Sequence, residues 1–412
     1  MRRFLLYSIL LLTLILPLLA QNPQEKPYVL VISFDGFRWD YPDRGITPNL
    51  DKMAADGVRA ITFEPAFPSK TFPNHYAIVT GLYPQNNGLI NNRFFDFFTG
   101  RQYRVGDTVS VRNAYWYKGE ALWETAQRQG IKSASFFWPG SEVRLSYRHP
   151  TYFKKYDGSV PPEKRIQGII DWLTLPAAKR PHLLFLYFSD TDTYGHRYGP
   201  NGEKINEAIR LLDRQVGILR AKIDSIGMSD RVNIILLSDH GMTQLRPDGR
   251  ILLFDILKNE KDVRVDGYGP LVQFFTSSRE QKQHVFNVLS KQAKGFTVYK
   301  KEDIPPYFHY KNNAFIGDVI AVADLGYTFI RTPQELKKME RRHPQGDHGY
   351  DNHTLDMQGI FFAVGPAFKT GYRCETLHNV DVYPLVCKIL GIVPNQKIDG
   401  KLERIAFILR GQ

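Results

Sequence analysis

Cysteine is nearly absent: the 412 residues contain only Cys374 and Cys387, both near the C-terminus. No metal-type Cys spacing accompanies them, so neither cysteine is expected to be catalytic. In an exported protein, two such cysteines are typical of one disulfide that closes a small loop. We therefore predict a Cys374–Cys387 disulfide; the alternative is two independent buried thiols.

Long hydrophobic runs are also missing, except at the N-terminus. Arg2 and Arg3 precede an apolar run from Phe4 to Leu19, and Ala20 supplies a small residue at its end. This pattern predicts a signal peptide over residues 1–20 and a secreted or periplasmic protein. After cleavage we expect no membrane span, whereas an uncleaved signal would anchor the protein in the membrane. No cysteine lies at this boundary, which excludes a lipid-modified cysteine as the anchor.

Low-complexity tracts are absent too, and 43% hydrophobic with 23% charged residues is the composition of a globular protein. The 54 basic residues exceed the 42 acidic ones and give a net charge of +12. This excess is spread along the chain, so it fits a small anionic substrate better than a stable nucleic-acid complex. Nothing in the sequence indicates the oligomeric state.

Five short apolar runs are continuous rather than alternating, which is typical of strands buried on both faces of a parallel sheet. They are Tyr28–Phe34, Ser133–Phe137, Leu183–Phe188, Val232–Leu237 and Gly359–Val364. Helix-length segments lie between them: Glu120–Gln129, Pro162–Leu173 and Gly202–Ile226. This order predicts an α/β fold in which a doubly wound, mostly parallel sheet is sandwiched by helices.

The pattern changes between about residues 252 and 342. Two strand-like runs, Leu271–Thr276 and Val319–Ala323, flank an amphipathic helix from Arg279 to Lys294. We expect this stretch to form a small α+β cap inserted into one domain that spans residues 28–412.

Acidic residues follow three of the predicted strands. Asp35 comes after the first, Asp190 and Asp192 after the third, and Asp239 after the fourth. In open α/β sheets, ligands bind beyond the carboxyl ends of the strands. One such aspartate alone would be ordinary turn chemistry, but three indicate a site.

Histidines accompany these carboxylates. His196 follows Asp192 by four residues, His240 follows Asp239 directly, and His348 lies in a glycine-bearing loop. Taken singly, each histidine could be a surface loop residue or a helix cap. Together, carboxylate and imidazole side chains occur in the numbers needed for two metal ions, and such ligands suit zinc.

A candidate nucleophile is Thr71. The segment that follows it has an apolar helical face and is ended by Gly81, with Pro73 in the first turn. A hydroxyl at a helix N-terminus is close to free N–H groups, which favour a phosphate or an alkoxide. The alternative is that Thr71 is only a helix cap, and the local sequence does not separate the two.

Several of these segments resemble the nucleotide pyrophosphatase/phosphodiesterase family of the alkaline phosphatase superfamily, specifically its short members that consist of the catalytic domain alone. The resemblance extends from about Tyr28 to Pro394 and rests on motifs in the family's order. They are Phe34-Asp35-Gly36, Lys70-Thr71-Phe72-Pro73-Asn74-His75-Tyr76, Thr80-Gly81-Leu82-Tyr83-Pro84, Phe137-Trp138-Pro139-Gly140-Ser141-Glu142, Gly195-His196-Arg197-Tyr198-Gly199-Pro200, Ser238-Asp239-His240-Gly241-Met242 and His348-Gly349-Tyr350-Asp351-Asn352.

The resemblance implies an alkaline-phosphatase-like fold and two Zn²⁺ ions per chain. One ion would be held by Asp192, His196 and His348. The other would be held by Asp35, Asp239, His240 and the hydroxyl of Thr71, the nucleophile that forms a phosphothreonine intermediate. Asn92 and the backbone N–H after Thr71 would bind a non-bridging phosphate oxygen. Phe72 and Tyr156 would stack a nucleobase, with Trp138 and Glu142 in the same pocket.

The implied function is hydrolysis of nucleotide phosphodiester or pyrophosphate bonds in a small-molecule substrate. Within the same family the alternative is a choline or lipid phosphodiesterase, and within the superfamily it is a phosphomonoesterase. A non-catalytic metal-binding protein on this fold is a third alternative. All six Asp/His ligands and the threonine are present, which favours an enzyme.

Overall fold

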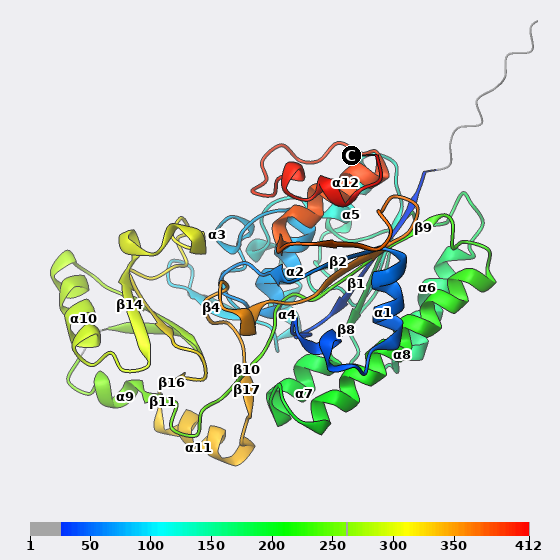
Figure 1. The fold of residues 1–412 in the computed structure, drawn as a ribbon. Helices are drawn as coiled ribbons and strands as arrows, with labels where there is room; N and C mark the ends of the chain where they lie inside the picture. Colours follow the sequence, from blue (N-terminus) through cyan, green and yellow to red (C-terminus); the bar gives the residue numbers. More distant parts are fainter. Residues whose placement is uncertain (1–25, 261–262, 412) are drawn as a thin grey trace, which may run out of the picture.

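The computed structural model describes residues 26–260 and 263–411, so the predicted signal peptide over residues 1–20 lies outside the described residues. An eight-stranded sheet forms the centre of the molecule (Figure 1). Its strand order is β19 (Tyr372–Cys374), β2 (Val58–Ala60), β18 (Phe361–Val364), β9 (Val232–Leu237), β1 (Tyr28–Phe34), β8 (Leu183–Phe188), β6 (Ser133–Phe136) and β7 (Tyr152–Lys154).

Most neighbours in this sheet are parallel. β1 pairs with β8 and with β9 in parallel, and β6 pairs in parallel with β8 and β7. β18 is the exception, because it runs antiparallel to β9, with Phe361 opposite Leu237. The chain reaches β18 from the edge where β9 ends, so it has to run back across the sheet. All five predicted strands are present, but the sequence does not reveal this reversal.

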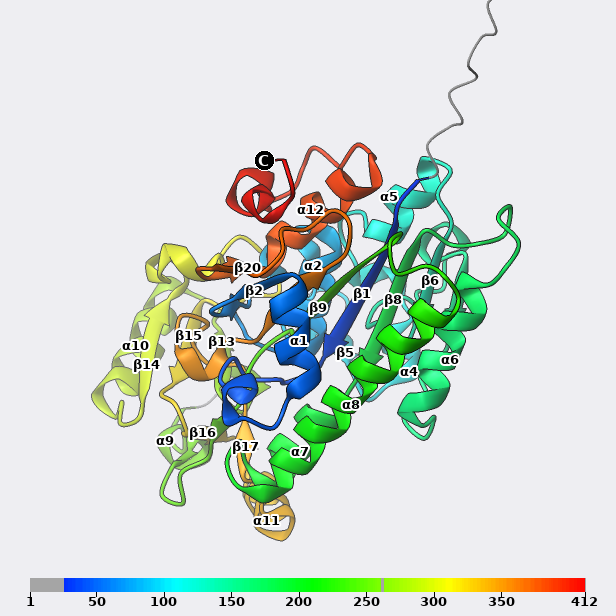
Figure 2. The same cartoon turned by 45° about the vertical axis from the view of Figure 1, so that its right-hand side comes forward.

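Helices cover both faces of the sheet and close two cores (Figures 1 and 2). Alternate residues of β1 serve the two faces: Val29 and Val31 pack into one core, Leu30 and Ile32 into the other. The first core includes α2 (Thr71–Thr80), α5 (Leu122–Arg128) and α12 (Val382–Leu390). The second includes α1 (Pro48–Asp56), α6 (Pro162–Leu173) and α8 (Glu203–Ser225). The α/β sandwich predicted from the sequence is therefore confirmed.

A second sheet lies beside this sandwich. It is antiparallel, with the order β12 (Arg264–Tyr268), β13 (Leu271–Phe275), β15 (Val319–Ala323) and β14 (Phe296–Lys300). Helix α10 (Arg279–Lys291) contributes Val285 and Leu289 to its separate hydrophobic core. Three further elements adjoin this core: the parallel pair β11 (Arg250–Leu252) and β16 (Thr328–Ile330), and α9 (Leu253–Ile256). Helix α11 (Pro333–Arg342) follows β16.

Shorter elements connect these layers. They are α3 (Pro84–Asn87), α4 (Thr108–Val111), α7 (Asp190–Tyr198), and the pairs β3 (Phe63–Glu64) with β20 (Leu377–His378), β4 (Arg93–Asp96) with β5 (Arg101–Arg104), and β10 (Thr243–Gln244) with β17 (Gly346–Asp347). Among the described residues, no helix is both long and apolar enough to cross a membrane.

The predicted Cys374–Cys387 disulfide is wrong in this structure, where both buried thiols are free. Cys374 ends the edge strand β19, and its Sγ faces the carbonyl of Arg59 on the neighbouring strand at 4.0 Å. Cys387 lies in the middle of α12, one turn after Tyr383, and is fully buried. A strand and a helix that pack into the core at different places hold the two sulfur atoms in separate surroundings.

Candidate active site

The three strand-terminal aspartates meet at the carboxyl edge of the sheet, as the sequence predicts. Asp35 follows β1 directly, and Asp239 follows β9 by two residues. After β8 the chain enters α7 at once, so Asp192 and His196 lie one helical turn apart on the same face. Parallel neighbours in the sheet therefore bring residues that are up to 204 positions apart, such as Asp35 and Asp239, into one site.

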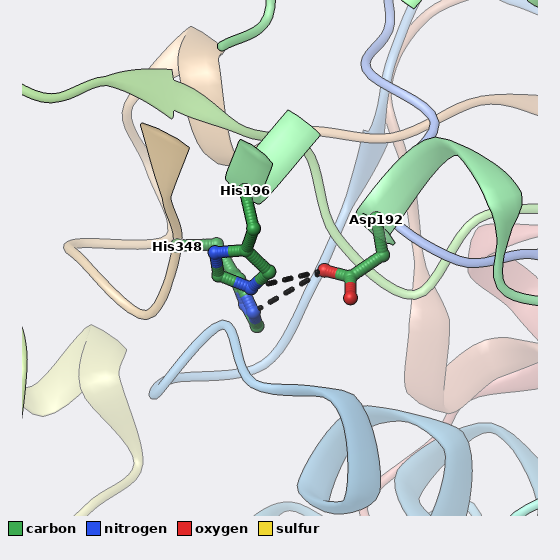
Figure 3. Close-up of side chains that lie close together, drawn as sticks. All are labelled: Asp192, His196 and His348. Carbon is green, nitrogen blue, oxygen red and sulfur yellow. Dashed lines mark ion pairs between the residues drawn. The ribbon is translucent and has the colours of Figure 1, made fainter. Parts of the chain in front are cut away.

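The first group of side chains consists of Asp192, His196 and His348. His196 Nε2 lies 3.3 Å and His348 Nε2 lies 3.5 Å from Asp192 Oδ1 (Figure 3). Figure 3 shows that both imidazole rings point toward the carboxylate, although they come from α7 and from the loop after β17.

The second group consists of Asp35, Asp239 and His240. His240 Nε2 lies 3.3 Å from Asp35 Oδ1 and 3.1 Å from Asp239 Oδ2. The rings of His240 and His348 are stacked with centroids 3.6 Å apart, so the two groups adjoin. Donor atoms lie within 4.8 Å of one another in three sets: Asp192, His196 and His348; Asp35, Asp192 and His240; and Asp35, His75 and Asp239.

The contacts of Nδ1 show which ring nitrogen carries the proton in the three histidines. Nδ1 of His196, His240 and His348 lies 2.8–2.9 Å from the carbonyl oxygens of Gly346, Gly241 and Ser69 respectively. A carbonyl only accepts, so each Nδ1 carries the proton and donates it. With Nδ1 as the donor to a carbonyl, Nε2 of each ring faces the carboxylates, which is the arrangement of metal-ligating histidines.

The carboxylate atoms that face these lone pairs have no donor. Asp35 Oδ1, Asp192 Oδ1 and Asp239 Oδ2 are buried and accept no hydrogen bond from the described residues. Burial, and then the charges of Asp239 and Asp192, raise the pKa of Asp35 well above its usual value. Acceptors that converge in this way lack a positive charge between them, and a divalent cation supplies one.

Thr71 is the first residue of α2, as predicted, and borders this cluster. Its Oγ1 lies 3.3 Å from His240 Nε2. The Phe72 N–H donates to Asn92 Oδ1 at 2.9 Å. That N–H is therefore occupied by Asn92 rather than free for a phosphate oxygen, and the Asn92 amide nitrogen is the donor that remains.

A cavity of about 430 Å³ opens next to Thr71. Phe72 and Tyr156, both proposed to stack a base, line it, and the Tyr156 ring lies 5.3 Å from that of Phe137. Trp138 also lines the cavity, but it is 1% exposed and its indole N–H donates to the His75 carbonyl at 3.2 Å.

Glu142 lines the same cavity, yet both of its carboxylate oxygens already have partners. Oε2 accepts from Arg112 at 2.6 Å, and Oε1 accepts the backbone N–H of Tyr156. Glu142 therefore holds Tyr156 and Arg112 in place at the wall of the cavity.

Four further residues of the site were not selected from the sequence. Lys70 is buried and pairs with Asp347 at 3.1 Å, and the Tyr187 hydroxyl donates to Asp35. His75 is buried beneath Thr71, and Arg112 pairs with Glu142. Lys70 and His75 lie within the motif around Thr71, which is a signal that could have found them. Tyr187 is one tyrosine in an apolar strand, and no local pattern marks it or Arg112.

Comparison with known proteins agrees with this geometry. Residues 29–351 match the model of the family described as type I phosphodiesterase / nucleotide pyrophosphatase. The chain is 35% identical over 393 residues to venom phosphodiesterase 2 of Crotalus adamanteus. This alignment covers 92% of this chain and 48% of the venom protein. Human ectonucleotide pyrophosphatase/phosphodiesterase family member 1 is also 35% identical over 393 residues. That alignment covers 92% of this chain and 42% of the human protein. The chain spans about half the length of these relatives.

Solved structures are similar along their whole length. Murine ectonucleotide pyrophosphatase / phosphodiesterase 5, as an inactive threonine-to-alanine variant in complex with AMP, has a TM-score of 0.86 and 31% identity. The human protein of the same name has a TM-score of 0.85 and 33% identity, and in both comparisons 93% of this chain and 100% of that chain are covered. The family match, the fold and the motifs agree: the chain belongs to the type I phosphodiesterase / nucleotide pyrophosphatase family.

Proposed function

We propose that this protein hydrolyses nucleotide phosphodiester or pyrophosphate bonds, with Thr71 as the nucleophile. The observation that carries the proposal is the position of Thr71 Oγ1, 3.3 Å from the ligand-type nitrogen of His240 and beside three carboxylate oxygens that have no donor. In the murine relative, a threonine-to-alanine variant is inactive, which supports a threonine at the centre of the chemistry.

The residues present fit two divalent ions, and we propose Zn²⁺ because the donors are carboxylates and imidazoles. Asp192, His196 and His348 would hold one ion; Asp35, Asp239, His240 and Thr71 would hold the other. When bound, the pair supplies the positive charge that lowers the pKa of the threonine hydroxyl and stabilises the oxygens of an in-line displacement.

The chain's own residues then define the reaction. Thr71 Oγ gives up its proton and attacks phosphorus, the bond to the leaving-group oxygen breaks, and the leaving group departs with that proton. The nucleoside 5′-phosphoryl group remains on Thr71 as phosphothreonine. Water next attacks phosphorus, the bond to Thr71 Oγ breaks, that oxygen regains a proton, and a nucleoside 5′-monophosphate is released. The Asn92 amide nitrogen donates to a non-bridging oxygen during both steps, where negative charge accumulates.

A nucleotide is the substrate class that this site suits best. Phe72 and Tyr156 offer aromatic faces in the cavity next to Thr71, and base stacking needs no particular base. The murine relative was solved in complex with AMP, which supports the assignment. Beside the cavity, basic side chains line an adjoining groove and favour an anionic substrate: Arg93, Arg104, Arg197, Lys338 and Arg342.

The wider setting is proposed on the same grounds. We propose one catalytic domain over residues 28–412 with a cap-like insertion at about 252–342, since the second sheet has its own core. An exported protein is supported by relatives that are venom proteins and ectonucleotidases by name. The expected partner is a small-molecule substrate rather than a nucleic acid.

The test is a substrate panel combined with trapping of the intermediate. Three substrates are compared on the zinc-loaded protein: p-nitrophenyl thymidine 5′-monophosphate, p-nitrophenylphosphorylcholine and p-nitrophenyl phosphate. The nucleotide diester is expected to have the highest kcat/KM, and acid quenching should leave the nucleoside phosphoryl group on the peptide that contains Thr71. A preference for the choline diester or the monoester would refute the nucleotide assignment, and modification of another residue would refute the role of Thr71.

A further inference from the structure

His75 lies directly beneath the candidate site and is completely buried. It lies one helical turn after Thr71 in α2, and its Nδ1 is 2.9 Å from the Thr71 carbonyl oxygen and 3.2 Å from Asp239 Oδ2. On the other side of the ring, Nε2 is 2.8 Å from the hydroxyl of Ser33 on β1. The imidazole of His75 therefore contacts the backbone of the proposed nucleophile, a proposed metal ligand and strand β1.

The protonation of this ring follows from its neighbours. The Thr71 carbonyl and the Asp239 carboxylate can only accept, so Nδ1 carries a proton, whereas the Ser33 hydroxyl can donate to Nε2. Although His75, Asp35 and Asp239 form one of the sets with closely spaced donor atoms, Nδ1 has no lone pair to offer a metal ion. Nε2 faces Ser33 rather than the carboxylates. His75 is therefore a poor metal ligand and a good donor.

The ring is fixed by packing as well as by these contacts. It stands edge-on to Trp138 and Tyr187, with centroid distances of 5.1 and 5.2 Å. The Trp138 indole also donates to the His75 carbonyl. His75 is not among the described residues that line the cavity, so it does not reach a bound substrate.

We propose that His75 is a positioning residue that holds Asp239 and the first turn of α2 in a fixed relation, so that the metal ligand and the Thr71 hydroxyl meet. Asp239 Oδ1 accepts the Gly36 N–H at 3.2 Å, and the other oxygen lies 3.2 Å from His75 Nδ1, whose N–H donates to the Thr71 carbonyl. With only one of these contacts, the carboxylate could rotate about its side-chain bond. This inference rests on the proposed function, because it assumes that Asp239 is a metal ligand.

Two substitutions of His75 test the roles of the two ring nitrogen atoms separately. His75→Asn places an amide nitrogen near the position of Nδ1, whereas His75→Gln places it near that of Nε2 and leaves no N–H beside the Thr71 carbonyl and Asp239. Zinc affinity is measured by competition with a chromophoric chelator, and melting temperature and kcat at saturating Zn²⁺ are recorded for each variant. We expect His75→Gln to weaken zinc binding by about 10–100-fold, the usual effect of losing an outer partner of a ligand. His75→Asn should remain within about threefold of the wild type, and kcat should follow the same order.

Ser33→Ala is the matched control, because it removes only the partner of Nε2. We expect it to leave zinc affinity within about threefold. If both His75 variants lose affinity equally, or neither folds, the residue serves packing alone and the proposal is overturned. It is also overturned if both bind zinc as the wild type does. A wild-type protein that binds zinc but cleaves no diester would refute the proposed function, while the pattern of zinc affinities would still decide the role of His75.

Discussion

The side chain of Thr71 is small, and its place at the start of α2 would suit a helix cap as well as a nucleophile. The N-cap position belongs to Lys70, however, and the Thr71 hydroxyl faces His240. Thr71→Ala is therefore expected to lower kcat by at least about 10³-fold, because the covalent step is lost, while the melting temperature changes little. Thr71→Ser should restore part of the rate.

The control for this change is Thr108→Ala, a threonine that lines the same cavity but lies outside the cluster. It should keep kcat within about threefold, as measured in the same steady-state assay. A Thr71→Ala protein within tenfold of the wild type would show that Thr71 only begins a helix.

The aromatic residues of the cavity make a separate prediction. Phe72→Ala and Tyr156→Ala are each expected to raise KM for p-nitrophenyl thymidine 5′-monophosphate by about tenfold, because each removes about 1–3 kcal/mol of base stacking. KM for methyl p-nitrophenyl phosphate, which has no base, should stay nearly constant. Phe98→Ala, at an aromatic ring that is 84% exposed and does not line the cavity, serves as the control. Equal effects on both substrates would argue against a base pocket.

Elements, rather than single residues, determine the state of the two cysteines. Cys374 belongs to edge strand β19 and Cys387 to helix α12, and burial raises the pKa of their thiols to about 11 and about 12 respectively. At pH 8 both are therefore protonated and unreactive in the folded protein. We expect Ellman's reagent to detect almost no thiol in the native protein and two thiols per chain after unfolding without reductant. An unfolded, unreduced protein with no free thiol would restore the disulfide prediction.

Element boundaries also explain how the proposed metal ligands are spaced. Asp192 and His196 fall on one face of α7 because the helix begins at Asp190, directly after β8. Had the chain continued as an extended loop, four residues would have separated the two side chains by a distance too great for one ion. The i, i+4 spacing is thus useful only because a helix starts there.

At the scale of the whole molecule, the residues of the proposed metal site join β1, β9, α7 and the loop after β17. Without cations, the carboxylates of Asp35, Asp192 and Asp239 repel one another at the edge of the sheet. Removal of metal by a chelator is expected to lower the melting temperature by at least about 5 °C, because binding at 1,000 times Kd stabilises a fold by about 4 kcal/mol. Differential scanning calorimetry with and without added Zn²⁺ measures this change.

The variant Asp35→Asn tests whether repulsion between the carboxylates causes this change in melting temperature. It removes one of the repelling charges, so it should raise the melting temperature of the metal-free protein and lower that of the zinc-loaded protein. A melting temperature that is independent of metal in the wild type would show that these residues hold no ion.

Much of the fold and of the site could be predicted from the sequence, because the signals are local. The run from Tyr28 to Phe34 is apolar at every position, which marks a strand buried on both faces, and Asp35 comes where that strand has to end. Likewise, Gly81 ends the helix that Thr71 begins, so both ends of α2 can be located from neighbouring residues. Residues at the ends of parallel strands share one edge whatever the order of the strands, which is why the sequence could predict that these aspartates lie close together.

Only the tertiary structure decided the features that depend on distant partners. The direction of β18, the separation of the two thiols and the use of Glu142 as a support for Tyr156 each depend on how elements pack. The carbonyl of Ser69, 279 positions earlier in the chain, determines which nitrogen of His348 carries the proton. The proposed role of His75 depends on its contacts with Asp239 and Ser33. No local pattern contains these contacts, since a side chain's hydrogen bonds and burial are set by whichever segments the fold places around it. The sequence by itself therefore determined which chemical groups the site contains, and the packing of the chain determined which atoms of those groups face one another.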